Sequence, residues 1–255
     1  MPRDPEHEVI RVELGPRSYD IHITSGDRQG LGAFARQWLR GTLAYVVTDE
    51  NVKEHGNAVS STLSAVGFRT AAAILPPGEK QKTLGMAASL YDQLARLRAD
   101  RHTVIVAVGG GVIGDLAGFV AATFARGLPL LMVPTTLLAM VDSSIGGKVG
   151  VNHPLAKNLI GAFHQPGGVW IDTALLSTLP EREYRSGLAE VVKYGVAFDP
   201  ELFTFLESNV SAVLARDPAA VRFLIGRCCR HKADVVARDE REETGLRALL
   251  NYGHT

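Results

Sequence analysis

The sequence predicts an α/β fold in two parts, a parallel-sheet domain over residues 1–175 and an all-helical domain over residues 176–255. Short β-rich apolar runs alternate with amphipathic helical segments through the first two-thirds of the chain. Apolar runs with helices between them are typical of a parallel sheet that is covered on both faces. From about residue 176 onward the pattern is helical alone, and the 46% hydrophobic content is enough to fill a substantial core.

The expected strands follow in order along the chain. Near the N-terminus, "EVIRVEL" and "YDIHI" predict a small antiparallel pair. Apolar runs then predict strands at residues 44–49, 71–75, 103–108 and 129–134. Between the second and third of these, residues 84–97 keep their apolar side chains on one face at a spacing close to 3.6 residues. This spacing predicts an amphipathic helix.

The helical part carries clear start signals. Asp-Pro occurs at residues 199–200 and again at residues 217–218. Aspartate is a favourable N-cap and proline suits the first helical position, so each pair predicts the start of a helix. Between the two parts, residues 141–167 are rich in glycine and carry two lysines among small polar residues. We expect the functional cleft in this segment.

Composition argues against several classes of partner. Lys and Arg together number 27, as do Asp and Glu, so no overall field attracts nucleic acid or an anionic membrane. No signal-type segment or membrane span is evident, and we expect a cytoplasmic protein. The two cysteines, Cys228 and Cys229, are adjacent in a helical segment, which predicts reduced packing residues instead of a disulfide framework or a zinc finger.

The segment "IVAVGGGVIGDLAGF" contains the pattern G-x-G-x-x-G over residues 109–114, directly after an apolar run. Glycines there let backbone N–H groups approach a pyrophosphate, to which the helix N-terminus adds a partial positive charge. A dinucleotide fingerprint also needs an acid roughly 20 residues further on. Nothing acidic lies between Asp115 and Asp142, so Asp49, which ends an earlier run, is the best-placed ribose ligand. A purely structural turn is the alternative for an isolated match.

Six segments form a longer series: "PPGEKQK", "GGGVIGDLAGF", "VPTTLLAMVDSSIGGKVGVN", "AKNLIGAFHQP", "GLAEVVKYG" and "DEREETGLRALLNYGHT". In order and spacing they resemble the 3-dehydroquinate synthase family, within the sugar phosphate cyclases, over nearly the whole chain. The resemblance implies an enzyme that uses NAD and a divalent cation, zinc or cobalt. Its implied substrate is DAHP, a seven-carbon keto sugar acid phosphate. Transient oxidation, phosphate elimination, re-reduction and aldol closure then produce 3-dehydroquinate.

The resemblance implies that Glu190 and His254 are metal ligands, and imidazole and carboxylate are suitable zinc donors. Lys193 lies three residues after Glu190, hence on the same helical face, where it can meet the substrate beside the metal. The alternative for this pair is a solvent-exposed ion pair on a helix surface.

The family pattern also implies a set of substrate-contacting residues. Arginine suits bidentate anion binding and lysine supplies a point charge. For Lys232 a slip of one residue is an alternative, because Arg230 and His231 are its neighbours, and a solvated helix face is another. With Lys193, the implied catalytic set is Lys148, Asn158, Arg126, Lys232, Arg247 and Asn251.

A third implied set binds NAD. Two acids accept hydrogen bonds from ribose hydroxyls and the glycine turn faces the pyrophosphate. For the two threonines after Pro134, helix capping is an alternative that can coexist with cofactor contact. The implied NAD-binding residues are Asp49, Glu79, Lys82, Gly111, Val112, Ile113, Gly114, Asp115, Thr135, Thr136, Asp142, Lys148, Lys157 and Thr178.

The family pattern continues past "NYGHT" to two more histidines, one of which completes the zinc set, so we expect the third metal ligand to lie outside this sequence and the chain to be a fragment. The resemblance further suggests a homodimer. Other hypotheses are a sugar phosphate cyclase acting on sedoheptulose or glucose phosphate, a metal-dependent polyol dehydrogenase and a non-catalytic NAD-binding remnant. Phosphate release distinguishes the cyclases from the non-catalytic remnant, and accumulation of NADH at steady state would indicate the dehydrogenase. Substrate assays separate the cyclases from one another.

Overall fold

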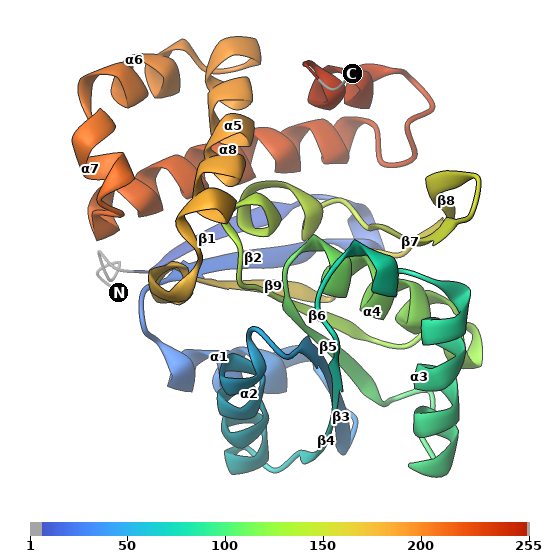
Figure 1. Cartoon of the computed structure of the whole chain (residues 1–255). Helices are drawn as coiled ribbons and strands as arrows, with labels where there is room; N and C mark the ends of the chain where they lie inside the picture. The colour runs from blue at the N-terminus through green and yellow to red at the C-terminus, as the bar shows by residue number, and fades with distance from the viewer. Residues whose placement is uncertain (1–6, 254–255) are drawn as a thin grey trace.

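A seven-stranded sheet organises the computed structural model, which describes residues 7–253 (Figure 1). Its strand order is β1-β2-β9-β6-β5-β3-β4, and every neighbouring pair is parallel except β1 with β2. The strands are β1 (Glu8–Val12), β2 (Tyr19–Thr24), β3 (Leu43–Asp49), β4 (Arg69–Leu75), β5 (Val104–Gly109), β6 (Leu130–Pro134) and β9 (Gly168–Asp172). The predicted parallel sheet and antiparallel pair are confirmed, although the pair is not separate, because β2 continues the main sheet beside β9.

Both faces of the sheet are buried, which explains the continuous apolar runs. Helices α1 (Arg28–Trp38) and α2 (Lys53–Ala65) cover one face, and α3 (Leu84–Arg96) and α4 (Gly111–Thr123) lie on the other (Figure 1). Along β5 alternate side chains enter the two layers: Val106 packs in the cluster with α1 and α2, whereas Ile105 belongs to the opposite cluster.

The C-terminal part is made of helices that lie against one end of the sheet (Figure 1). They are α5 (Glu181–Ala197), α6 (Pro200–Ser208), α7 (Val210–Leu214) and α8 (Pro218–Arg238), and α8 packs against β1 and β2. The carboxylate of Asp199 accepts a hydrogen bond from the N–H of Leu202, and that of Asp217 accepts from Ala219 and Ala220. Both predicted Asp-Pro starts are therefore confirmed.

Between the sheet and the helices the chain forms a π-helical turn over Ala139–Ser143 and an antiparallel hairpin of β7 (Lys148–His153) and β8 (Ala156–Phe163). The hairpin lies in the glycine-rich segment where the sequence predicts the functional cleft. A Cβ at Gly150 would lie 2.8 Å from the carbonyl oxygen of Ile160, so this glycine is what lets the two strands approach. Short 3-10 turns span Gly15–Arg17, Glu79–Gln81, Phe124–Arg126, Thr173–Thr178 and Leu246–Asn251.

Two further expectations concern the cysteines and membrane-spanning helices. Cys228 and Cys229 are free and fully buried in α8, as expected for packing residues, and burial raises the pKa of both thiols. Within residues 7–253, every helix falls short of the combination of length and apolarity that crossing a bilayer requires.

Gly118 on α4 supports the hairpin, and replacing it tests this contact. A Cβ at Gly118 would lie 2.3 Å from Cγ1 and 2.9 Å from Cβ of Val149 in β7. We expect Gly118→Ala to lower the free energy of unfolding by about 1–3 kcal/mol, because overpacking outweighs the gain in helix propensity. Gly85→Ala in α3 is the matched control, since its nearest neighbour would be 3.8 Å away. Urea unfolding of both variants measures the difference, and equal stabilities would contradict the packing argument.

Candidate functional site

A cavity of about 590 Å³ lies where α4, the β7–β8 hairpin, α8 and the C-terminal turn meet. Its lining includes three carboxylates, of which one comes from the segment after α8, together with lysine, arginine and asparagine side chains. The polar lining residues are Asp115, Asp142, Ser143, Lys148, Asn158, Lys232, Glu242, Arg247 and Asn251. The fold thus brings together five residues of the predicted substrate set and three of the predicted NAD set, with Lys148 in both, from segments far apart in sequence.

Lysine ammonium groups in and beside this cavity are paired with carboxylates. The pairs are Lys82 with Asp115, Lys148 with Glu242, Lys193 with Glu190 and Lys232 with Asp142. Each lysine approaches from a different element, and each pairing neutralises a charge that partial burial would otherwise make costly. The ligand-free site therefore holds its cations as neutral pairs.

Lys82 is the centre of a network at the base of the cavity. Its side chain is buried, and Nζ donates to Oδ2 of Asp115 at 2.7 Å and to Oδ1 of Asn158. Asn152 extends the network by donating through Nδ2 to Oε1 of Glu79 at 2.8 Å. Burial raises the pKa of Asp115, and the Lys82 charge opposes that rise. The network joins the predicted cofactor residues Glu79 and Lys82 to the cavity.

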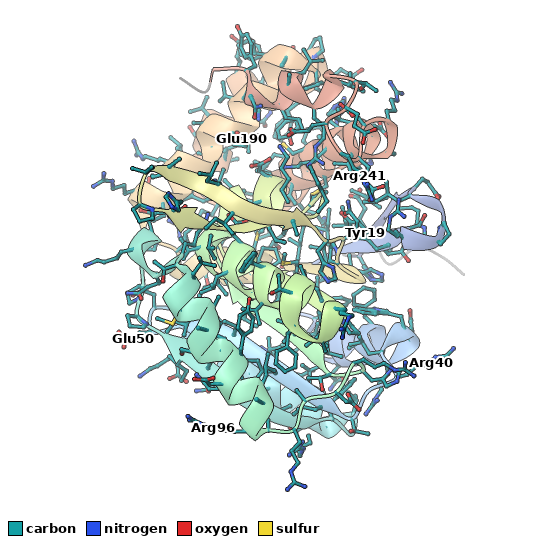
Figure 2. The ribbon with its side chains drawn as sticks, turned by 90° about the vertical axis from the view of Figure 1, so that its right-hand side faces the viewer. Tyr19, Arg40, Glu50, Arg96, Glu190 and Arg241 are labelled. Atoms are coloured by element: carbon teal, nitrogen blue, oxygen red, sulfur yellow. The ribbon has the colours of Figure 1, made fainter. Side chains whose placement is uncertain are left out.

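Glu190 and Lys193 lie one helical turn apart on α5, where the side-chain pair is buried. Lys193 Nζ donates to Glu190 and to the carbonyl oxygen of Leu250, which itself lines the cavity. Figure 2 shows Glu190 in the helical part of the molecule, beyond the sheet. The alternative of a solvent-exposed ion pair is wrong, because both groups are withdrawn from solvent.

The predicted metal ligands are only partly visible. Glu190 offers one carboxylate, and His254 lies outside the described residues. Among residues 7–253, His, Cys, Asp and Glu side chains form no group of three that could hold a metal ion. Of the two predicted metal ligands, the described part of the chain therefore contains Glu190.

Arg247 enters the cavity wall as a buried cation held by backbone oxygens. Nη1 donates to the carbonyl oxygens of Gly146 at 3.2 Å and Glu240 at 2.7 Å, and burial lowers the guanidinium pKa. Gly146 has φ of +97°, and a Cβ there would lie 2.6 Å from Nη2 of Arg247. A glycine is needed at position 146 for two reasons: its φ is unfavourable for other residues, and a side chain there would clash with Arg247. Tyr19, labelled in Figure 2, accepts the N–H of Gly146 through its hydroxyl at 3.1 Å.

The predicted nucleotide turn lies at a reversal of strand order. β3 and β5 are neighbours, but the chain visits β4 on the far side of β3 between them, so the strand order reverses at their carboxyl ends, where open α/β sheets generally have the crevice that binds nucleotides. Asp49 ends β3, and burial raises its pKa. Gly110 precedes α4 and makes no side-chain cap, so the first N–H groups of α4 have no capping side chain. The start of α4 thus offers N–H donors, and the end of β3 offers a carboxylate.

Thr135 and Thr136 follow β6 at the same edge, and the structure distinguishes them. Thr136 Oγ1 accepts the N–H of Ala139 at 3.1 Å, so the predicted capping role is confirmed for this residue. Thr135 Oγ1 is buried and has no hydrogen-bond partner. A buried hydroxyl without a partner is costly, and a bound ligand that supplies one would relieve that cost. The crevice residues therefore fit a nucleotide cofactor.

Among the predicted residues that do not line the cavity, the side chains of Arg126, Lys157 and Thr178 also form no hydrogen bond or ion pair with a described residue that does. Arg126 is exposed in the turn after α4 with φ of +67°. Lys157 is exposed on β8, and Thr178 contacts His55 on α2, with 3.0 Å between Oγ1 and Nε2. The structure brings none of these three side chains to the lysine-rich cavity in this single chain.

Sequence reasoning missed Glu242, which lines the cavity, and Asp239, which shapes the loop after α8. The acidic run "DEREETG" was the available signal, because it directly precedes Arg247. Phe163 and Leu159 of the hairpin also line the cavity. Nothing local in the sequence marks these two as lining residues, since only the folded hairpin turns them toward it.

Solved structures first define the class. A 2-deoxy-scyllo-inosose synthase complexed with carbaglucose-6-phosphate, NAD⁺ and Co²⁺ is 27% identical, with a TM-score of 0.89 over 97% of this chain and 68% of that one. A 2-epi-5-epi-valiolone synthase from Streptomyces hygroscopicus with NAD⁺ and Zn²⁺ bound is 28% identical, with a TM-score of 0.83 over 95% and 66%. An iron-containing alcohol dehydrogenase shares the fold alone, at 17% identity, a TM-score of 0.64 and coverage of 91% and 68%. The fold is that of a sugar phosphate cyclase.

Within that class, the chain belongs to the 3-dehydroquinate synthase family. The family model described as 3-dehydroquinate synthase N-terminal matches residues 72–186, and the C-terminal model matches residues 187–255. A 3-dehydroquinate synthase from Geobacter metallireducens is 53% identical over 97% of this chain and 69% of its own length. The one from Desulforamulus reducens is 51% identical over 97% and 69%. The expected family is confirmed.

The Lys82 network generates a prediction with a pH dependence. We expect Lys82→Met to destabilise the protein by about 3 kcal/mol at pH 8, because it leaves the Asp115 carboxylate without its counter-charge. The loss of Lys82 also raises the pKa of Asp115 further, so the destabilisation shrinks as the pH falls and that carboxylate becomes protonated. Urea unfolding at pH 5 and pH 8 measures it. Lys80→Met, in the same turn but exposed, is the control, and equal losses in both variants would contradict the argument.

Proposed function

We propose that this chain carries 3-dehydroquinate synthase activity, a carbon–oxygen lyase reaction that eliminates phosphate from DAHP and closes a carbocycle. The observation that carries the proposal is the single cavity that gathers Lys148, Asn158, Lys232, Arg247 and Asn251. Family membership supports the same reaction. The substrate carries a phosphate and a carboxylate, and a cavity rich in cations and amide groups has the donors that both groups require.

Each cavity residue has a role that suits its chemistry. Arg247 is held by backbone oxygens, so it presents a preorganised cation toward a carboxylate or phosphate. Lys148 and Lys232 supply mobile point charges, and the amides of Asn158 and Asn251 orient hydroxyl groups. Lys193 holds a positive charge beside the C-terminal turn through its bond to the carbonyl of Leu250. These groups bind and orient one polyhydroxylated anion.

We assign Asp49, the turn from Gly111 to Asp115 and Thr135, which lie at the ends of β3, β5 and β6, to the NAD site. Asp49 accepts from a ribose, the turn from Gly111 to Asp115 faces the pyrophosphate, and the Thr135 hydroxyl gains a partner. When bound, NAD⁺ supplies reversible hydride transfer at the substrate. Glu190 and His254 are the proposed donors to a zinc or cobalt ion, which supplies Lewis acidity toward substrate hydroxyls. The resemblance alone supports a homodimer, which sedimentation equilibrium measures.

The first experiment is phosphate release from DAHP by the full-length gene product that carries this sequence, with NAD⁺ and Zn²⁺ added. We expect dehydroquinate and phosphate in equal amounts with no NADH at steady state. Sedoheptulose 7-phosphate and glucose 6-phosphate test the other cyclase reactions, and accumulating NADH would indicate a polyol dehydrogenase. NAD⁺ binding without phosphate release from any of the three would leave a non-catalytic remnant.

Lys232 provides a variant of the same assay. We expect Lys232→Met to lower kcat/KM for DAHP by about 10- to 100-fold, since hydrogen bonds to charged groups contribute roughly 1.5–3 kcal/mol. Arg230→Met, two residues earlier on α8 and bonded to Glu8 outside the cavity, is the control. The same loss in both variants would argue against a substrate contact for Lys232.

Thr135 gives a prediction in which stability and binding move in opposite directions. We expect Thr135→Val to leave the ligand-free protein as stable or up to about 1 kcal/mol more stable, because an unpartnered buried hydroxyl is removed. NAD⁺ affinity falls by about 5-fold, since the cofactor loses a hydrogen bond. Calorimetric titration measures it. Thr136→Val is the matched variant, and loss of the Ala139 cap costs it about 1 kcal/mol of stability. Unchanged NAD⁺ affinity in Thr135→Val would remove Thr135 from the cofactor site.

A further inference from the structure

Glu242 is the one carboxylate of the four lysine pairs that has no place in the proposed chemistry. Glu190 is a proposed metal donor, and Asp115 and Asp142 belong to the proposed cofactor set. Glu242 instead crosses the cavity from the loop after α8 and accepts a hydrogen bond from Nζ of Lys148, which begins β7. Both residues line the cavity. The pair therefore joins two walls of the site across the space that an anionic ligand would enter.

The loop that carries Glu242 is held in place by Asp239. Oδ1 of this buried carboxylate accepts the N–H groups of Glu243 at 2.8 Å and Thr244 at 3.1 Å, and Oδ2 accepts that of Arg247 at 3.2 Å. Glu242 itself has φ of +60°, a left-handed conformation that is unfavourable for a residue with a side chain. Backbone strain of this kind persists where the surroundings impose it, often at ligand sites. The loop thus holds the Glu242 carboxylate against Lys148.

The Glu242 carboxylate can be replaced at Lys148 by another anion. The Lys148 side chain is 47% exposed and that of Glu242 is 34% exposed, so the contact is weak, as ion pairs screened by solvent are. A phosphate carries up to two negative charges and three acceptor oxygens, so it binds an ammonium group more strongly than one carboxylate does. A phosphate bound at Lys148 and the Glu242 carboxylate would repel each other, because both are negatively charged. Only one of the two anions can therefore occupy the position at Lys148.

We propose that Glu242 is a specificity-determining residue: it occupies the anion position at Lys148 in the ligand-free protein and is displaced by a phosphate-type dianion of the ligand. An uncharged sugar lacks the charge to displace it, so Glu242 adds a cost that only phosphorylated ligands offset. Naming that ligand as the substrate rests on the proposed function. The exchange of one anion for another does not require turnover, so it can be measured separately.

The test measures binding of inorganic phosphate to the full chain at constant ionic strength, from the rise in Tm with phosphate concentration. We expect Glu242→Gln to bind phosphate about 3- to 5-fold more tightly than the unchanged protein, because the competing carboxylate is gone. Glu243→Gln is the matched control, since it makes the same charge change at the next, exposed residue. Its phosphate affinity stays unchanged. The gain also disappears when Lys148→Met is added to Glu242→Gln.

Other outcomes overturn the proposal. Unchanged or weaker phosphate binding by Glu242→Gln would mean that Glu242 does not compete for the anion position. Equal tightening in Glu242→Gln and Glu243→Gln would reveal a general charge effect. If Glu242→Gln fails to fold, Glu242→Asp replaces it, since the shorter side chain withdraws from Lys148 without a charge change. Tighter phosphate binding with no phosphate release from DAHP would uphold this inference and count against the proposed function.

Discussion

One electrostatic constraint governs the site: ammonium groups that converge in partly buried surroundings each need an opposite charge. Lys82 and Lys193 are almost fully withdrawn from solvent, and each donates to a carboxylate and to one further oxygen. Without those acceptors a buried ammonium group would lose its proton or destabilise the fold. Pairing lets the lysines of several elements converge in and beside one cavity.

Strand order places the proposed cofactor crevice next to the lysine-rich cavity. The reversal between β3 and β5 separates the helices that follow these strands, which leaves room at their carboxyl ends. Asp115 lies in the first turns of α4, so it belongs to the glycine turn and also lines the cavity. Its bond to Lys82 links the two regions. A cofactor and a substrate bound in these two places would lie side by side, as hydride transfer between them requires.

The helical part depends on the sheet part for its own geometry. Arg247 donates to the carbonyl of Gly146, and Arg17 near the N-terminus pairs with Glu240 at 2.6 Å. These contacts join the segment after α8 to the chain just before β7 and to the turn between β1 and β2, and Arg241 appears above the N-terminal strands in Figure 2. Because the cavity wall after α8 is anchored to the sheet, the cations of both parts keep a common arrangement.

The sequence by itself determined six of the seven strands of the main sheet, the capped helices, the glycine turn and the family, because periodicity, Asp-Pro starts and motif order are local properties of the chain. It missed β9, which lies between β2 and β6 in that sheet. It did not reveal the β7–β8 hairpin, since most side chains of β8 are exposed and show no apolar alternation. It also could not reveal that Glu242 meets Lys148, 94 residues away, or that the Glu190 and Lys193 pair is buried. Only the tertiary structure decided which charges meet and which are shielded from water, because those depend on distances between elements that no local pattern encodes.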